Sequence, residues 1–510
     1  MKKLRLILGD QLNSEHSWFK QIDNDTIYVL AEMRQETDYV KHHIQKVVAF
    51  FLSMRNFYNS IQAQGHQAIY FQINDNSNPN DLAKIINSCI EKYNIEKFEY
   101  LLPDEYRLDE QLKSICANLT IPSEAFDSEH FYTTRHELAQ FFEGKKLLLM
   151  ENFYRNMRKK HHVLMDGSTP TGKQWNFDHD NRKKYKGEIP IPAEKNFNTD
   201  VTEVVSQIKE AGIITFGNID EKKFSWPTSR DQSLQVLDYF CHHLLKHFGD
   251  YEDAMHTDEK FLFHSRLSFA MNSKMLSPKE VIETVIAFYH ANETNITISQ
   301  VEGFVRQILG WREYIRGIYW KEMPNYAQMN VLENKNKLPD FFWTGKTKMN
   351  CMSHAINQSL DEAYAHHIQR LMVIGNFTLL TQIHPDEVDA WYLGVYIDAI
   401  EWVEMPNTRG MSQYADGGII ATKPYFSSGS YINKMSNNCT KCQYNVKEKF
   451  GDKACPFNTL YWNFLDEKKD YFKGNQRMAM MLNLLKKMDP EELFKIKTKA
   501  NEIIASMDSY

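Results

Sequence analysis

The segment MKKLRLILGD (residues 1–10) begins a pattern in which short apolar runs alternate with amphipathic helices. Residues 4–8 and 27–31 are apolar runs between polar turns, which is typical of buried parallel strands. From Val40 to Ile61, apolar side chains recur at three- and four-residue steps, which predicts a helix that Gly65 ends.

The same pattern continues along the N-terminal part of the chain. Residues 68–73 and 98–102 predict two more strands, with a helix over 82–93 between them. This order predicts a doubly wound parallel sheet, which binds ligands beyond the carboxyl ends of its strands. Residues 9–11 and Glu32 lie at those ends, and the absence of a Gly-x-Gly-x-x-Gly motif argues against a dinucleotide there.

The rest of the chain has no strand pattern. Residues 144–232 are punctuated by Gly and Pro, and the pattern is helical from Ser233 onward. The segments at 277–280 and 489–492 each supply a cap, a proline and a glutamate that closes a capping box. We therefore predict an α/β domain over residues 1–135, a linker over 136–232 and an all-α domain over 233–510.

Composition indicates a soluble globular protein. The chain has 510 residues, of which 42% are hydrophobic and 25% charged, enough for two to four domains. No apolar run reaches the roughly 18 residues of a membrane span, and the first run breaks too early for a signal peptide. We expect a cytoplasmic protein without a membrane partner, in which Cys89, Cys116 and Cys241 are reduced core thiols.

Four further cysteines have the spacing of a metal site. Cys439 and Cys442 form a Cys-x-x-Cys pair, Cys455 precedes Pro456, and Cys351 comes from a separate helical segment. Four thiolates suit either a tetrahedral zinc or an iron–sulfur cluster. The Cys-Pro step favours iron–sulfur, whereas a structural zinc or unrelated thiols are the plainer alternatives.

Charge is distributed unevenly. The net charge of −6 argues against nucleic acid, but residues 145–187 contain 11 Lys and Arg against 4 Asp and Glu. Trp175 and Phe177 are interleaved with these basic residues. A solvated linker is the default explanation, and a loop that binds the DNA backbone is the functional one.

Four segments of the C-terminal half are similar to the FAD-binding segments of photolyases and cryptochromes. They are FHSRLS (263–268), RQILGWREY (306–314), HHIQR (366–370), and Asp398 with Glu404 six residues later. Together with the four cysteines, they make the chain resemble the iron–sulfur bacterial branch of this family, the prokaryotic (6-4) photolyases, over essentially its full length.

The resemblance implies an α/β antenna domain and an all-α domain that binds FAD and a 4Fe–4S cluster. The implied FAD residues are His264, Ser265, Leu267, Ser268, Glu302, Gln307, Trp311, Tyr314, Arg370, Asp398 and Glu404. The implied antenna is 6,7-dimethyl-8-ribityllumazine at Asp10 and Glu36, although Glu36 could equally be a charge at a helix N-terminus. The implied cluster ligands are Cys351, Cys439, Cys442 and Cys455.

The resemblance also assigns roles in a reaction. His366 and His367 match the repair histidines, and His367 is the first choice as proton donor, against the alternative of one surface and one core histidine. Trp343, Trp391 and Tyr392 match an electron-transfer chain, and Asp178 and Asp253 match a possible Mg²⁺ site.

The expected function is light-dependent reversal of (6-4) photoproducts in UV-damaged DNA, by electron transfer from reduced FAD in a monomeric protein. A cryptochrome-type photoreceptor with the same cofactors is the alternative. A helical iron–sulfur module that binds nucleic acid without flavin is a third possibility.

Overall fold

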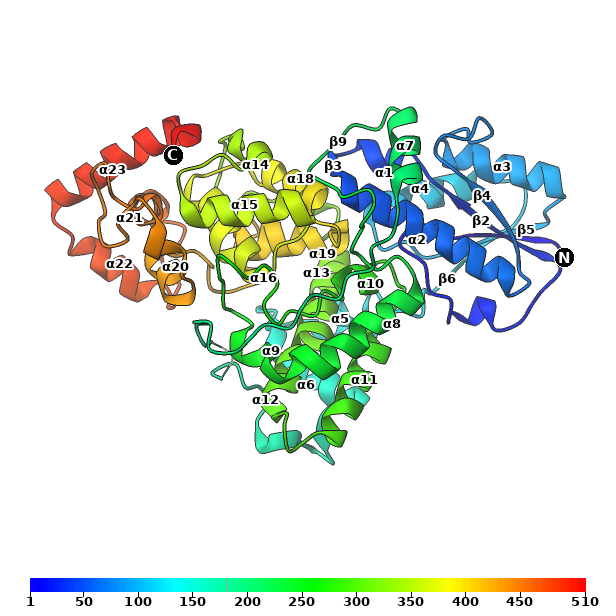
Figure 1. The fold of residues 1–510 in the computed structure, drawn as a ribbon, viewed down its shortest axis with the longest axis horizontal. Helices are drawn as coiled ribbons and strands as arrows, with labels where there is room; N and C mark the ends of the chain where they lie inside the picture. The colour runs from blue at the N-terminus through cyan, green and yellow to red at the C-terminus, as the bar shows by residue number, and fades with distance from the viewer. Residues whose placement is uncertain (181) are drawn as a thin grey trace.

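The protein, described here from a computed structural model for residues 1–180 and 182–510, contains a five-stranded parallel sheet (Figure 1). Its strand order is β4-β2-β1-β5-β6. The strands are β1 (Lys3–Leu6), β2 (Thr26–Ala31), β4 (Gln67–Phe71), β5 (Lys97–Leu101) and β6 (Ser123–Phe126). The predicted doubly wound sheet is confirmed. The edge strand β6 was not predicted, because its sequence Ser-Glu-Ala-Phe is mostly exposed and lacks an apolar run.

Helices cover both faces of the sheet. On one face, α3 (Leu82–Tyr93) and α4 (Tyr106–Ala117) pack on Leu4, Leu6 and other strand residues. On the other face lies α2 (Ile44–Ala63), which belongs to the same apolar cluster as the helical half. α2 begins four residues later than predicted. The preceding residues form β3 (His42–His43), and the His43 side chain caps the helix by accepting from Gln45 N.

The predicted linker contains helices that were not predicted, because the glycines and prolines around them indicated an irregular segment. α6 (Met150–His161) buries Phe153, Tyr154 and Met157, and α7 (Thr202–Glu210) packs on α2.

From α8 (Arg230–Tyr239) onward the chain is helical, and residues 230–510 form no strand beyond isolated bridges. The caps at Ser277 and Asp489 are confirmed, since each side chain accepts from the backbone N–H three residues on. The Glu280 carboxylate, however, accepts from Arg230 instead of closing a capping box.

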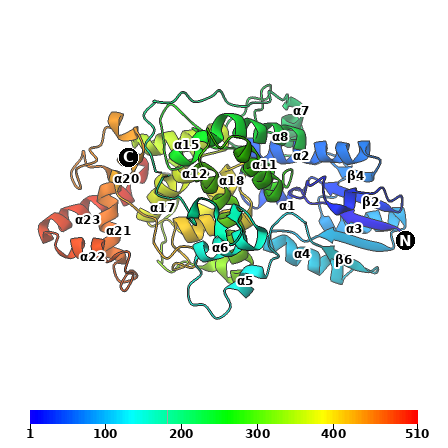
Figure 2. The ribbon, with the colours of Figure 1, turned by 90° about the horizontal axis from the view of Figure 1, so that it is seen from below.

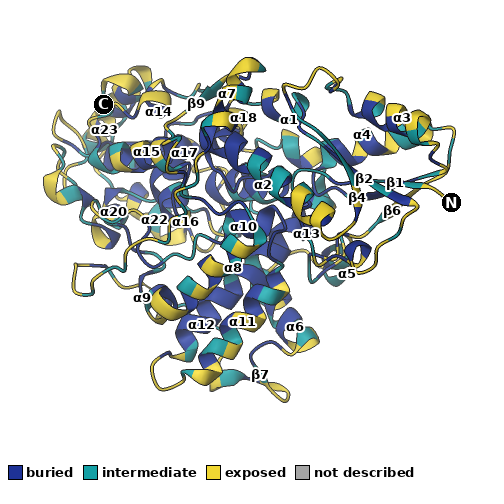
Figure 3. Ribbon diagram, turned by 45° about the vertical axis from the view of Figure 1, so that its right-hand side comes forward, coloured by how far each residue is buried: buried dark blue, intermediate teal, exposed yellow. Residues whose placement is uncertain are grey.

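Figures 1 and 2 place the sheet at one end of the molecule and α22 (Ala479–Lys486) and α23 (Pro490–Ala505) at the other. Buried residues face inward on the central helices (Figure 3). The main apolar cluster runs without interruption from Ile7 to Ile503. Within residues 1–180 and 182–510, no helix combines the length and apolar character that crossing a membrane requires.

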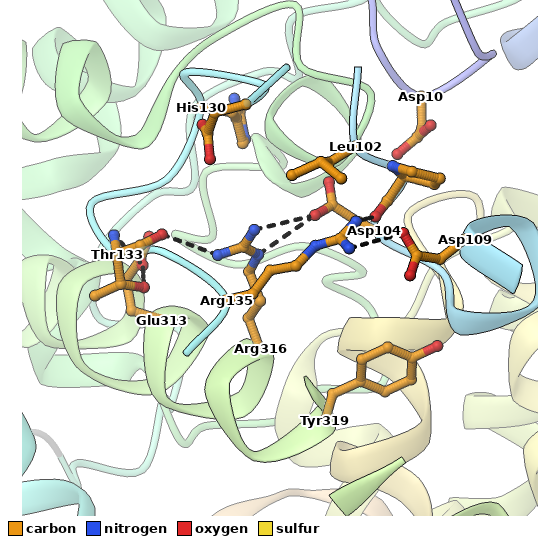
Figure 4. Close-up of polar contacts among 12 residues, drawn as sticks. Asp10, Leu102, Asp104, Asp109, His130, Thr133, Arg135, Glu313, Arg316 and Tyr319 are labelled. Carbon is orange, nitrogen blue, oxygen red and sulfur yellow. Dashed lines mark hydrogen bonds and ion pairs between the residues drawn. The ribbon is translucent and has the colours of Figure 1, made fainter. Parts of the chain in front are cut away.

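A buried ion network joins the carboxyl edge of the sheet to the helices (Figure 4). Asp104, just after β5, forms ion pairs with Lys274 Nζ at 2.8 Å and with Arg316 Nε at 3.3 Å; Arg316 lies on α13 (Glu313–Glu322). Lys274 also donates to Asp10 Oδ2 at 2.7 Å, and Arg316 donates to the Thr133 carbonyl at 2.9 Å. The Asp104 side chain is 1% exposed, so its charge depends on these two cations.

We expect Asp104→Ala to lower the free energy of unfolding by about 3 kcal/mol or more, because it leaves buried Arg316 without its ion-pair partner and Lys274 with Asp10 alone. Urea denaturation followed by circular dichroism would measure the change. The control Asp470→Ala removes an exposed ion pair with Lys473 and should stay within about 0.5 kcal/mol. Equal losses for the two variants would contradict the importance of the network.

Candidate cofactor and substrate site

Asp398 is the centre of a hydrogen-bonded group built from three distant segments. It lies in the turn after α18 (Pro385–Val395) and accepts from Arg370 Nη1 and Nη2 at 3.0 and 3.1 Å. Ser268 Oγ donates to the same carboxylate at 2.6 Å, and Asn272 Nδ2 donates to the Asp398 carbonyl at 2.7 Å. Three of the predicted FAD residues, Ser268, Arg370 and Asp398, thus meet in space.

Glu404, on α19 (Glu401–Met405), is a buried acid with an unsatisfied oxygen. Its Oε1 has no hydrogen-bond partner among the residues that the structure describes. Burial, and then the nearby Asp389, raise the pKa of Glu404 well above the usual value, which favours the protonated carboxyl that can donate a hydrogen bond. Such a group requires a polar partner, which a nitrogen of a flavin ring would provide. The donor set around Asp398 and Glu404 therefore fits FAD.

The histidines form a compact group beside Arg370. The His264 and His366 rings stack with centroids 4.6 Å apart and an interplanar angle of 12°. His366 is buried. The side chain of His367 is exposed to solvent, although many protein atoms lie close around its ring. Burial lowers the pKa of His264 and of His367 to about 4, and that of His366 well below its usual value. All three rings are therefore neutral at pH 7 in this structure.

Four other predicted FAD residues contact protein groups. Fully buried Glu302, on α12 (Ile298–Val305), accepts from Tyr154 Oη at 2.9 Å and from the Phe177 backbone at 3.0 Å. Tyr314 donates to the Leu148 carbonyl at 2.7 Å, so both residues fix the linker segment. Gln307 donates to Glu252 at 2.7 Å, and half-buried Trp311 packs edge-on to Tyr314. Their role toward FAD stays a prediction.

Aromatic rings lead from the surface toward Arg370. Trp391 contacts Tyr392 at 5.5 Å between centroids, and Tyr392 contacts Tyr396 at 5.4 Å. The Arg370 guanidinium lies 3.8 Å from the Tyr396 centroid. Trp343 is 40% exposed and follows Phe342, whose ring packs on Trp391. Sequence reasoning did not assign Tyr396 to this chain of rings, although its position four residues after Tyr392 was an available signal.

The four predicted cluster cysteines border one cavity. Cys351 lies on α15 (Asn350–Glu362), and Cys455 caps α21 (Pro456–Lys468). Burial and the neighbouring thiols Cys455, Cys439 and Cys442 raise the pKa of Cys351. Across residues 1–180 and 182–510, no three His, Cys, Asp or Glu side chains are close enough together to hold a single metal ion. Four thiols around one cavity suit a 4Fe–4S cluster or a zinc ion, and the cluster stays a prediction.

A second cavity, of about 130 Å³, lies at the carboxyl ends of β1 and β2. Asp10 and Glu36 both line it, together with mostly apolar residues and with residues 399–400 of the helical half. Asp10 Oδ2 is bound by Lys274, and Glu36 accepts from Arg107 at 2.7 and 3.2 Å. Each carboxylate is thus held in place, and the apolar walls suit a planar ring ligand.

The predicted Mg²⁺ residues already have cationic neighbours. Asp178 forms ion pairs with Arg182 and, at 3.5 Å, with Arg306. Burial raises the pKa of Asp253 to about 6. The described side chains group no third His, Cys, Asp or Glu closely enough with these two to form a metal site, so a divalent ion here stays a prediction.

The basic segment divides into structural and exposed residues. Arg158 is fully buried and donates to the carbonyls of Leu164 and Trp175 at 2.5 and 2.9 Å. Arg182 and Lys183 are each 59% exposed, although Lys183 pairs with Asp250. Only part of the segment can therefore reach DNA.

Several known proteins are similar to this chain in sequence or in fold. Residues 5–224 match the family model described as deoxyribodipyrimidine photo-lyase-related protein. The chain is 39% identical to a (6-4) photolyase of Agrobacterium fabrum over 512 aligned residues, which cover 100% of both chains.

Two crystal structures share the fold. A bacterial class III photolyase from Agrobacterium tumefaciens has a TM-score of 0.56 at 14% identity, and the match covers 96% of this chain and 98% of that chain. The cryptochrome of Synechocystis sp. PCC6803 has a TM-score of 0.60 at 13% identity, with 96% and 99% covered. The chain therefore belongs to the photolyase/cryptochrome family.

Proposed function

We propose that this protein is a light-dependent photolyase that reverses (6-4) photoproducts in UV-damaged DNA. The observation that carries the proposal is full-length identity of 39% to a protein named (6-4) photolyase. The meeting of Ser268, Arg370 and Asp398 beside His366 and His367 supports it, because that group has the donors an FAD would need next to a proton donor.

When bound and reduced, FAD supplies one electron to the lesion under light. Arg370 and Ser268 hold Asp398 in one orientation, from which its carboxylate can bind the flavin ring. Burial favours the protonated form of Glu404, which can donate a hydrogen bond to a ring nitrogen. His367 donates a proton to the hydroxyl that leaves one base.

His367 must be protonated to act as this acid. Its pKa of about 4 reflects burial and the Arg370 charge. Phosphate groups of FAD and of DNA would place negative charge near the ring and raise that pKa toward the physiological range. A flipped base pair would remove water from this exposed side chain, which opposes protonation, so the phosphate charges have to outweigh that loss.

Further partners belong to the same proposal. The cavity at Asp10 and Glu36 would hold the ribityllumazine antenna, and the four cysteines would hold a 4Fe–4S cluster. Asp178 and Asp253 would bind Mg²⁺ only after Arg182 turned away from Asp178, which a DNA phosphate could cause. We expect the protein to act as a monomer on damaged DNA.

The decisive experiment is repair of an oligonucleotide with one (6-4) lesion under blue light, with reductant and Mg²⁺, against a dark control. We expect light-dependent restoration, and a loss of about 100-fold or more in His367→Ala, because general acids contribute that much. The control His290→Ala changes an exposed histidine on α11 (Pro278–Ala291) and should repair normally. Absence of repair by protein that carries FAD would favour a photoreceptor.

We expect Cys439→Ala to give insoluble protein or to lose the broad visible absorption of an iron–sulfur cluster, because ligation contributes folding free energy. Solubility, absorption spectrum and iron content would be measured together. The control Cys241→Ala removes a buried thiol remote from the four and should keep its iron. Iron content equal to that of wild type in Cys439→Ala would rule out the assigned ligands.

Charge reversal of Arg182, Lys183 and Lys184 to Glu should weaken binding to duplex DNA and reduce its salt dependence, since each lost phosphate contact lowers the slope by about 0.9. Fluorescence anisotropy at several salt concentrations would measure both quantities. Reversal of the exposed Lys209, Lys222 and Lys223 provides a control of equal charge. If both triple variants bind equally, the basic segment is a plain linker.

A further inference from the structure

Lys46 is a buried lysine that connects the two halves of the molecule. It is the third residue of α2, it packs beneath the sheet, and it is 5% exposed. Its Nζ donates to the carbonyls of Leu393 and Ala399, both at 2.7 Å. These acceptors lie about 350 residues away along the chain, so the ammonium joins the α/β layer to the helical half.

The two carbonyls bracket the turn that carries Asp398. Leu393 is in the last turn of α18, where carbonyls lack partners within the helix and carry partial negative charge. Ala399 directly follows Asp398. A cation bound to both carbonyls therefore fixes the turn on either side of Asp398, whose own side chain is held by Arg370 and Ser268.

The ammonium also acts at longer range on the acids of the flavin site. Burial lowers the pKa of Lys46 to about 8, and the nearby Asp398 carboxylate opposes that shift, so Lys46 remains mostly charged at pH 7. In turn, the Lys46 charge lowers the pKa of Glu404, together with Arg409, against burial and Asp389. Lys46 is thus a positive charge behind the acids that face the flavin position.

Lys46 lines the α/β cavity as well. The same cavity contains Asp10, Glu36 and residues 399–400. One side chain therefore borders the proposed antenna site while it binds the backbone that positions Asp398.

We propose that Lys46 is a positioning residue of the flavin site, supplied by the antenna half of the chain. It holds the Asp398 turn in place and adds a positive charge that favours reduced, anionic flavin over oxidised flavin. This inference rests on the proposed function, because it presumes that FAD binds beside Asp398 and Glu404.

The test is the midpoint potential of the bound flavin in purified full-length protein, measured by reductive titration against a reference dye. For Lys46→Met we expect the ratio of reduced to oxidised flavin at a fixed potential to fall at least tenfold. Lys46→Gln keeps a hydrogen-bond donor without the charge, and we expect the same ratio to fall similarly in this variant. In Lys46→Arg the ratio should stay within threefold of the wild-type value. Lys84→Met, an exposed lysine on α3, is the control and should not change.

The outcomes separate this inference from the proposed function. A flavin-loaded Lys46→Met or Lys46→Gln protein with unchanged potential would overturn the role of Lys46. If Lys46→Met fails to fold, Lys46→Gln and Lys46→Arg decide by the same comparison. Protein with the expected potential shifts but without repair activity would refute the photolyase proposal and leave the role of Lys46 standing.

Discussion

The Asp104 carboxylate determines how the sheet meets the helices. A charge with 1% exposure is tolerated only because Lys274 and Arg316 both reach it, and those residues come from two different helical segments. Lys274 follows closely after Asn272, which donates to the Asp398 carbonyl. The same short segment therefore fixes the edge of the sheet through Lys274 and the turn that contains Asp398 through Asn272. Buried ion pairs contribute little net stability, and their value here is a unique relative placement.

Much of the fold could be predicted from local pattern. The helix over residues 82–93 matches α3 at both ends, because its apolar spacing is regular and Asp81 caps it. The start of α2 could not be predicted, because His42 and His43 pair with β9 (Thr215–Phe216), far along the chain. β6 and the linker helices also depend on partners that local sequence does not reveal.

The residues of the site were predicted more completely than their contacts. Ser268, Arg370 and Asp398 were chosen from family motifs, and the spacing of Ser268 gave no sign that it donates to Asp398. Glu302 and Tyr314 belong to the same motifs, yet their polar atoms hold the linker. Sequence analysis did not single out Lys46, because its two acceptors are backbone carbonyls. Every residue has such a carbonyl, so no sequence motif marks the ones that bind Lys46. Backbone recognition of this kind is invisible until the chain is folded.

The main apolar cluster has a consequence for how the α/β half of the chain could be exchanged in evolution. α2 packs on the sheet with one side and belongs to the cluster that extends to Ile503 with the other. Loss of the first 135 residues would remove α2 and expose to water the apolar side chains of the helical half that belong to the same cluster. The truncated protein would self-associate through that apolar surface. The α/β half is therefore not an interchangeable module. A change of the ligand in its cavity has to come from substitutions within that cavity, and recombination with a foreign domain would first have to recreate the shared interior.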